Sequence, residues 1–255
     1  AINDALASLA GARDRIRTLR AARDLTEGVV VTFAQGVYPV QQAVLFTPQD
    51  SGTAEAPIVY RAASNAEAII SGGREIDGWV QEGAFWVTTV PEVQAGTWSF
   101  SNLWVNGERR QPARTPNAAH PWGDEPPDSD FFKAAGPVMV ENMETGKQAK
   151  SSTKFHYREG DIQNWASLDD AIVVTFHSWA TSVMRLKSVD REQKILEFTG
   201  PARWAYGRWQ PDQRYFIEHL FEGLDQPGEW YLNKKMGKLY YYPMPDEKIE
   251  DVEVV

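Results

Sequence analysis

Short β-prone runs separated by turn residues dominate the first third of the chain, and their spacing limits the folds available. The runs are rich in branched and aromatic residues and recur roughly every 10 to 15 residues, which is too close for helical crossovers between them. Two architectures fit: an antiparallel sandwich, or a parallel coil in which each strand stacks on the one before. No Asn-Gly or Asp-Gly turn joins these early strands, which favours the coil. The expected strands are Val29–Phe33, Ala43–Thr47, Ile58–Ala62 and Ala68–Ser71.

A helix is expected before the first strand. Asp4 can cap it, and a set of apolar residues follows the spacing of one buried stripe. Arginines between positions 13 and 23 fill mainly the other faces, which we interpret as solvated. Such a helix would cover the open end of a coiled core, and residues 1–97 are the expected N-terminal domain. The stripe consists of Leu6, Leu9, Ala10, Ile16 and Leu19.

The stretch 98–243 has a different pattern and is expected to be an inserted β-rich subdomain. It contains long irregular segments such as His120–Pro127. The clearest hairpin lies within Glu229–Pro243, where two aromatic strands flank a Lys-Lys-Met-Gly turn. Residues 244–255 are expected to begin a further strand that stops abruptly, which predicts a fragment whose open end is covered by a C-terminal chain or a second copy. The other expected strands are Leu103–Val105, Ala171–Phe176, Val183–Leu186 and Ile195–Phe198.

Composition narrows the class of partner. The formal charge of −9 argues against nucleic acid, whose binding depends on Lys and Arg. No run of eighteen apolar residues is present, so no membrane span is expected. The chain has no cysteine, which excludes thiolate metal sites, and no cofactor is expected. Ten Trp, nine Tyr and eleven Phe suit carbohydrate, because flat aromatic faces stack on sugar rings; the alternative is that these rings fill a β core.

Two segments carry the candidate binding residues. His177-Ser178-Trp179 follows an apolar strand, at a junction where His177 can bond a sugar hydroxyl or transfer a proton and Trp179 can stack. The alternative is a structural histidine that fixes the turn. The loop 200–209 holds the densest aromatic and cationic cluster, which forms either a wall of a glycan cleft or a packing contact. The predicted substrate-binding residues are His177, Trp179, Arg203, Trp204, Arg208 and Trp209.

Glu218 and Glu222 are four residues apart, which would place them on one face of a helix. Glycosidases need two carboxylates facing each other about 5 to 10 Å apart across the substrate. Two carboxylates on one helix face point the same way, so the simpler interpretation is a solvated surface. His219 lacks a second histidine at metalloprotease spacing, and no metal site is predicted.

Several longer stretches resemble the opening of bacterial right-handed parallel β-helix proteins of the glycoside hydrolase type, which include fucosidase-like and xylanase-like enzymes. The matching stretches are Pro48–Ala62 with Ile70–Gly73, Leu103–Arg110 with Ala113-Arg114, Phe198–Ala202, and Pro227–Leu232. The resemblance implies an all-β fold with an N-terminal capping helix, the first coils of a parallel β-helix and an inserted β-rich subdomain.

The same resemblance implies that the chain is the N-terminal part of a glycoside hydrolase acting on a plant or algal type polysaccharide or oligosaccharide. In that family the catalytic carboxylates lie in later coils, so no catalytic residue is assigned here. A bacterial secreted or periplasmic protein is implied, with no signal peptide in this chain. The alternatives are a non-catalytic carbohydrate-binding or adhesion module and, ranked last for want of an Asp-rich calcium pattern, a polysaccharide lyase.

Overall fold

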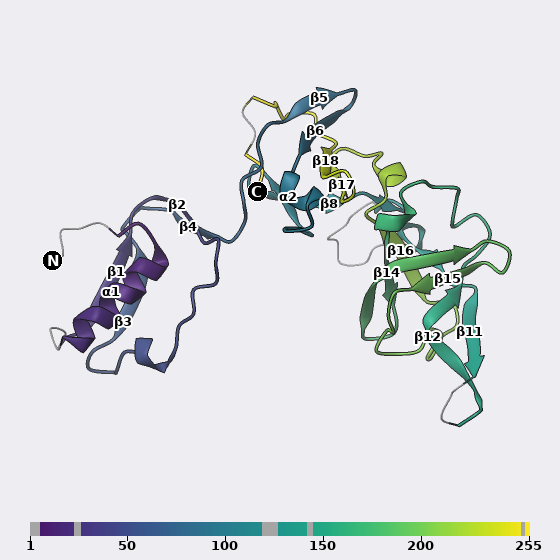
Figure 1. Ribbon diagram of the computed structural model, residues 1–255, viewed down its shortest axis with the longest axis horizontal. Coiled ribbons are helices and arrows are strands. Elements are labelled where there is room, and N and C mark those ends of the chain that lie inside the picture. Colours follow the sequence, from purple (N-terminus) through teal and green to yellow (C-terminus); the bar gives the residue numbers. More distant parts are fainter. Residues whose placement is uncertain (1–5, 23–26, 119–126, 142–144, 251–252) are drawn as a thin grey trace. The chain divides into compact units, whose positions relative to one another are not determined.

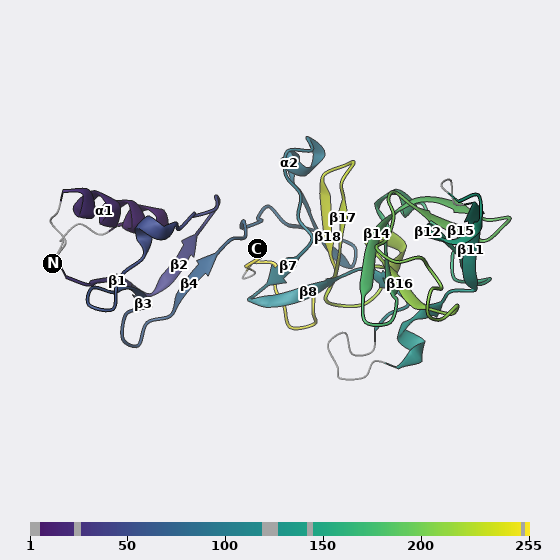
Figure 2. The ribbon, with the colours of Figure 1, turned by 90° about the horizontal axis from the view of Figure 1, so that it is seen from below.

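The computed structural model describes residues 6–22, 27–118, 127–141, 145–250 and 253–255 (Figures 1 and 2). Contacts divide the chain into two compact units. The first comprises residues 1–75 and Val255, and the second comprises residues 76–254. No described helix is both long and apolar enough to cross a membrane.

The first unit begins with the expected helix, α1 (Leu9–Ala21). The Ser8 hydroxyl accepts the N–H of Gly11 at 3.1 Å and caps the helix. Asp4, the expected cap, lies outside the described residues. Of the predicted stripe, Ile16 is buried, whereas Leu6 is exposed. The helix contacts a 3₁₀ turn, Pro48–Asp50, and the Arg17 guanidinium there donates to both carboxylate oxygens of Asp50 at 2.7 Å.

Two parallel ladders complete this unit. Strand β1 (Val29–Phe33) pairs with β3 (Ile58–Ala62), and β2 (Gly36–Pro39) pairs with β4 (Ala68–Ser71). The predicted strands β1, β3 and β4 are thus confirmed. The predicted strand Ala43–Thr47 is wrong: this segment is irregular, and Leu45 is 69% exposed. Its carbonyl group at Leu45 accepts from Arg13 Nη1 at 2.9 Å instead of joining a ladder.

The second unit contains a six-stranded sheet in the order β5-β6-β18-β17-β8-β7. Strands β17 and β8 run parallel, and the other neighbours are antiparallel. The sheet packs on a core that includes Trp86, Trp230 and Tyr241, together with the short helix α2 (Pro91–Gln94) through Val93. The strands are β5 (Val80–Glu82), β6 (Phe85–Thr89), β7 (Leu103–Val105), β8 (Glu108–Pro112), β17 (Glu229–Asn233) and β18 (Lys238–Tyr241).

An eight-stranded sheet forms the rest of this unit, in the order β10-β16-β13-β14-β15-β12-β11, with β9 also paired to β16. Its neighbours run antiparallel around a core that contains Phe155, Tyr215 and Ile217. The strands are β9 (Arg114–Thr115), β10 (Phe132–Lys133), β11 (Gly136–Glu141), β12 (Gln148–His156), β13 (Ile172–Phe176), β14 (Thr181–Asp190), β15 (Ile195–Phe198) and β16 (Arg214–Glu218).

The expected parallel β-helix is wrong. None of the described sheets closes into a coil, and the two large sheets are antiparallel or mixed. The two parallel ladders of the first unit have only two strands each, so no stack forms. A tight turn explains the antiparallel pairing of β7 with β8 in the second unit. Asn106 and Gly107 have φ of 53° and 77° and join β7 to β8 as a two-residue hairpin.

The aromatic hairpin predicted within 229–243 is confirmed as β17 and β18. The strands predicted at Leu103–Val105 and Ile195–Phe198 match β7 and β15, and Ala171–Phe176 and Val183–Leu186 overlap β13 and β14. The chain is therefore mostly β, as expected, although the arrangement of its strands differs.

Candidate functional site

Three of the predicted binding residues come together at the surface of the second unit. They are Trp179, Trp204 and Trp209. The ring centroids of Trp179 and Trp209 are 4.6 Å apart, and those of Trp204 and Trp209 are 5.3 Å apart. The Trp179 residue is 72% exposed and Trp209 is 37% exposed. Large exposed rings gathered in this way mark interaction sites more often than isolated surface rings do.

Arginines accompany the rings. Arg208 Cζ lies 5.0 Å from the ring centroid of Trp204 and 5.3 Å from that of Trp209, and Arg203 Cζ lies 5.7 Å from that of Trp204. Cation–π contacts of this kind hold the guanidinium groups beside the indole faces. We call Trp179, Trp204, Arg208 and Trp209 the tryptophan patch.

His177 does not reach the surface. It is buried, and its Nε2 lies 2.7 Å from Ser182 Oγ, while Gln213 Nε2 lies 3.1 Å from His177 Nδ1. Gln213 Oε1 accepts the N–H of Gly207 at 2.7 Å, so this network fixes the loop that carries Trp204 and Trp209. Burial lowers the pKa of His177. The geometry favours the structural interpretation of this histidine, with Gln213 as a partner that sequence reasoning missed.

A second site, which sequence reasoning also missed, lies on the outer face of strand β16. Tyr215 and Ile217 point into the core, so the alternating Arg214, Phe216 and Glu218 lie on the opposite face. Strand β9 pairs with β16 so that Arg114 is the register partner of Glu218. The alternation within Arg-Tyr-Phe-Ile-Glu was the available signal for this face. Arg114 and Arg214, however, are a hundred positions apart in sequence, and only the fold brings them into one pocket.

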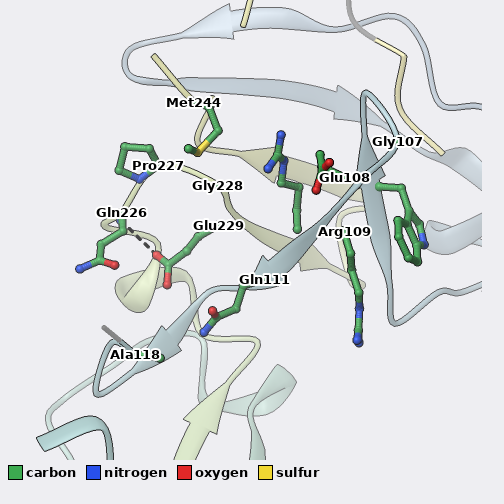
Figure 3. A pocket seen from close by; sticks show the side chains of 12 residues that line it. Gly107, Glu108, Arg109, Gln111, Ala118, Gln226, Pro227, Gly228, Glu229 and Met244 are labelled. Carbon is green, nitrogen blue, oxygen red and sulfur yellow. Dashed lines mark hydrogen bonds between the residues drawn. The ribbon is translucent and has the colours of Figure 1, made fainter. Parts of the chain in front are cut away.

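These residues line a pocket of about 490 Å³. We call it the arginine cleft and define it by Arg109, Arg114, Phe131, Phe176, Arg214, Phe216 and Glu218. A neighbouring pocket of about 620 Å³ is lined by some of the same residues, namely Arg109, Arg110, Gln111 and Ala118. In Figure 3, Arg109 and Gln111 lie on strand β8. Glu229 lies on the neighbouring strand β17, where it is the register partner of Gln111.

Arg114 is held rigidly at the base of the cleft and is 7% exposed. Its Nε donates to the carbonyl of Pro116 at 2.9 Å, and its Nη2 donates to the carbonyl of Asp130. Its Cζ lies 3.8 Å from the ring centroid of Phe216. Burial lowers the pKa of Arg114, and burial raises the pKa of Glu218 against the attraction of Arg114 and Arg109.

Glu229 fastens the turn at the edge of the neighbouring pocket. Glu229 is 5% exposed, and its Oε2 accepts the N–H groups of Asp225 and Gln226, both at 3.0 Å. Figure 3 shows the bond from Gln226. Gly228, directly before Glu229, has φ +88°, a backbone conformation that glycine adopts without strain. Burial raises the pKa of Glu229 to about 7.

The helical face expected for Glu218 and Glu222 is wrong. Glu218 ends strand β16, and Glu222 lies in a 3₁₀ turn (Phe221–Gly223), where its Oε1 accepts the N–H of Ala166 at 2.6 Å. Between them His219 adopts φ +56° and is buried beside Trp230. Within the described residues, no group of three or more His, Asp or Glu side chains could hold a metal ion.

Comparison with known proteins supports the fold. Neither a protein-family model nor a curated protein matches this chain. A solved structure named "Glycoside hydrolase" superposes with a TM-score of 0.75 over 97% of this chain at 24% identity. The match covers 42% of that structure's chain, so this chain spans less than half of that protein's length. The chain therefore shares the fold of part of a glycoside hydrolase.

Proposed function

We propose that this chain is the N-terminal part of a carbohydrate-active enzyme of the glycoside hydrolase type, and that the tryptophan patch binds its glycan. The observation that carries the proposal is the gathering of Trp179, Trp204 and Trp209 at the surface, with Arg208 beside them. The likeness to part of a glycoside hydrolase adds support.

The physical basis is stacking. The C–H face of a pyranose is apolar and packs on an indole, while its hydroxyl groups bond to neighbouring polar groups. Trp179 and Trp209 expose ring surface, and the Arg208 guanidinium presents N–H donors next to them. Under this proposal the catalytic carboxylates belong to the rest of a longer protein, so the chain binds the saccharide without cleaving it.

Calorimetric titration tests the proposal with neutral oligosaccharides of plant and algal polysaccharides, including xylo-oligosaccharides and fucosylated oligosaccharides. We expect binding by the wild type and a loss of roughly tenfold or more in affinity in Trp179→Ala and in Trp209→Ala, since truncated aromatic anchors cost 2 kcal/mol or more. Phe46→Ala is the matched control, because Phe46 is an exposed aromatic residue of the other unit.

The same oligosaccharides are then assayed for release of reducing sugar. Binding that is insensitive to both tryptophan substitutions, or no binding at all, would contradict the role of the patch. Cleavage by this chain alone would contradict the assignment of the catalytic groups to another part of the protein.

A further inference from the structure

We infer that the arginine cleft binds a saccharide through a carboxylate group, that is, a uronate residue. This inference rests on the proposed carbohydrate function and names a substrate class for it. The site differs from the tryptophan patch, because the two share no residue.

Arg214 is the cation best placed to meet a ligand. Its Cζ lies 4.8 Å from the ring centroid of Phe131 and 5.8 Å from that of Phe176, so the aromatic rings hold the guanidinium in place. No hydrogen bond or ion pair within the described part of the chain engages its side chain. A preorganised guanidinium with available donors loses little conformational entropy when it binds an anion.

Arg114 supplies a second fixed charge. Two of its nitrogens donate to uncharged backbone carbonyls, and the carboxyl groups of Asp130, Glu218 and Glu229 act on its charge through space. Arg109 lines the same cleft from strand β8 and donates to Asn102 Oδ1 at 2.7 Å. Arg110 is different, because its charge is paired with Glu247 at 2.7 Å.

Two acidic residues, Asp130 and Glu218, also line the cleft. Burial raises the pKa of Glu218, while the charges of Arg114 and Arg109 act to lower it. Among the described residues that line the cleft, four arginines stand against these two acidic residues, although the whole chain carries a formal charge of −9.

The walls favour a sugar acid over a small inorganic anion. Phe131, Phe176 and Phe216 provide apolar surface that an isolated phosphate could not use. The volume of about 490 Å³ lies within the range of small-molecule sites and exceeds what one small anion fills. A planar guanidinium also matches the geometry of a carboxylate, which it can engage with two parallel hydrogen bonds.

The test compares trigalacturonate with its fully methyl-esterified form by calorimetric titration, at matched ionic strength. The two probes share the sugar chain and differ in charge. We expect the wild type to bind the acid about tenfold more tightly than the ester, since charge-assisted hydrogen bonds are worth this much or more. Arg214→Gln is expected to reduce that preference at least threefold, because it removes one of the guanidinium groups that meet the carboxylate.

Arg61→Gln is the matched control, because it removes the same charge from an exposed position in the other unit and is expected to keep the preference. Arg109→Gln is a second cleft variant at an exposed side chain, for use if Arg214→Gln fails to fold by circular dichroism; it is expected to reduce the preference at least threefold.

Equal affinity for acid and ester in the wild type would overturn the inference, as would an unchanged preference in the folded cleft variants. Competition by inorganic phosphate as strong as by trigalacturonate would overturn it too. Binding of neutral glycans that depends on Trp179 would meanwhile leave the proposed function standing, so failure of the two proposals is distinguishable.

Discussion

Arg114 and Glu218 are register partners where strand β9 pairs with strand β16, and both side chains line the arginine cleft. Three positions earlier along the same segment, Gln111 pairs with Glu229 of β17. The segment from Gln111 to Thr115 therefore joins the six-stranded sheet to the eight-stranded sheet, and two buried or half-buried glutamates flank it. The free energy of unfolding of the second unit should therefore depend on the protonation of buried groups such as Glu229.

Glu229→Gln should stabilise the protein at high pH. Burial raises the pKa of Glu229 from 4.5 to about 7, so the folded chain keeps a proton that the unfolded chain releases between these values. Stability from this group is full below pH 4.5 and is lost as pH rises through 7. Glutamine stays uncharged and keeps an acceptor for Asp225 and Gln226. We expect the variant to gain, relative to wild type, on the order of 3 kcal/mol between pH 4.5 and pH 8.

Urea unfolding at pH 4.5, 6 and 8 measures this difference. A constant difference in the free energy of unfolding between Glu229→Gln and wild type across the three pH values would contradict it.

His219→Asn should remove a destabilisation at low pH. Burial lowers the pKa of His219 from 6.5 to about 4, so the unfolded chain binds a proton before the folded chain does. Stability therefore falls as pH drops from 6.5 to 4, by on the order of 3 kcal/mol. Asparagine tolerates the φ of +56° at this position and does not titrate.

The effects of His219 and Glu229 have opposite signs over overlapping pH windows, so they offset each other in the wild type. The single variants should separate them in the urea series. If the free energy of unfolding changes by the same amount in His219→Asn and in wild type between pH 8 and pH 4.5, the account of His219 is wrong.

Gln213→Leu should loosen the loop that carries the tryptophan patch. It removes the donor to His177 Nδ1 and the acceptor of the Gly207 N–H, and leaves both buried groups without this partner. We expect a loss of about 2 to 4 kcal/mol in the free energy of unfolding, together with a weaker near-ultraviolet tryptophan signal. Gln193→Leu, at an exposed position, serves as the control. An unchanged stability in Gln213→Leu would show that the network does not fix the loop.

Tyr215→Phe tests the core of the eight-stranded sheet. The Tyr215 hydroxyl is buried and donates to Asp161 Oδ2 at 2.6 Å. Its removal is expected to cost about 1 to 3 kcal/mol, because the half-buried Asp161 loses a charge-assisted hydrogen bond. Tyr242→Phe is the control, because Tyr242 is half-buried. The midpoint temperature of thermal unfolding is measured for both variants and for wild type. Equal stability of the two variants would contradict this assignment.

Local pattern predicted individual strands well and their arrangement poorly. Runs such as Val29–Phe33 and Leu103–Val105 carry their own β propensity, so their positions were found from sequence. Which strands become neighbours depends on contacts between residues far apart, such as those that place β16 between β10 and β13. The absence of turn signals among the early strands was a weak guide, because the informative Asn106-Gly107 turn lies later in the chain.

The two candidate sites show the same contrast. The tryptophan patch draws on two short segments rich in aromatic residues, so the sequence alone singled out its members as candidates. The ring centroids of His177 and Trp209 are 6.5 Å apart, but His177 is buried and bonded to Ser182 and Gln213, which no local pattern reveals. The arginine cleft unites Arg114 and Arg214 only through the pairing of β9 with β16 and the packing of Phe131, which is a property of the fold.

The most direct measurement of the proposed glycan contact follows the indole N–H resonances in ¹H–¹⁵N spectra during titration with a neutral oligosaccharide that binds. Our account predicts that the signals of Trp179, Trp204 and Trp209, assigned with single substitutions, shift with the calorimetric affinity. Those of the buried Trp86 and Trp230 should stay in place. Shifts confined to other tryptophans, with these three unmoved at saturation, would contradict it.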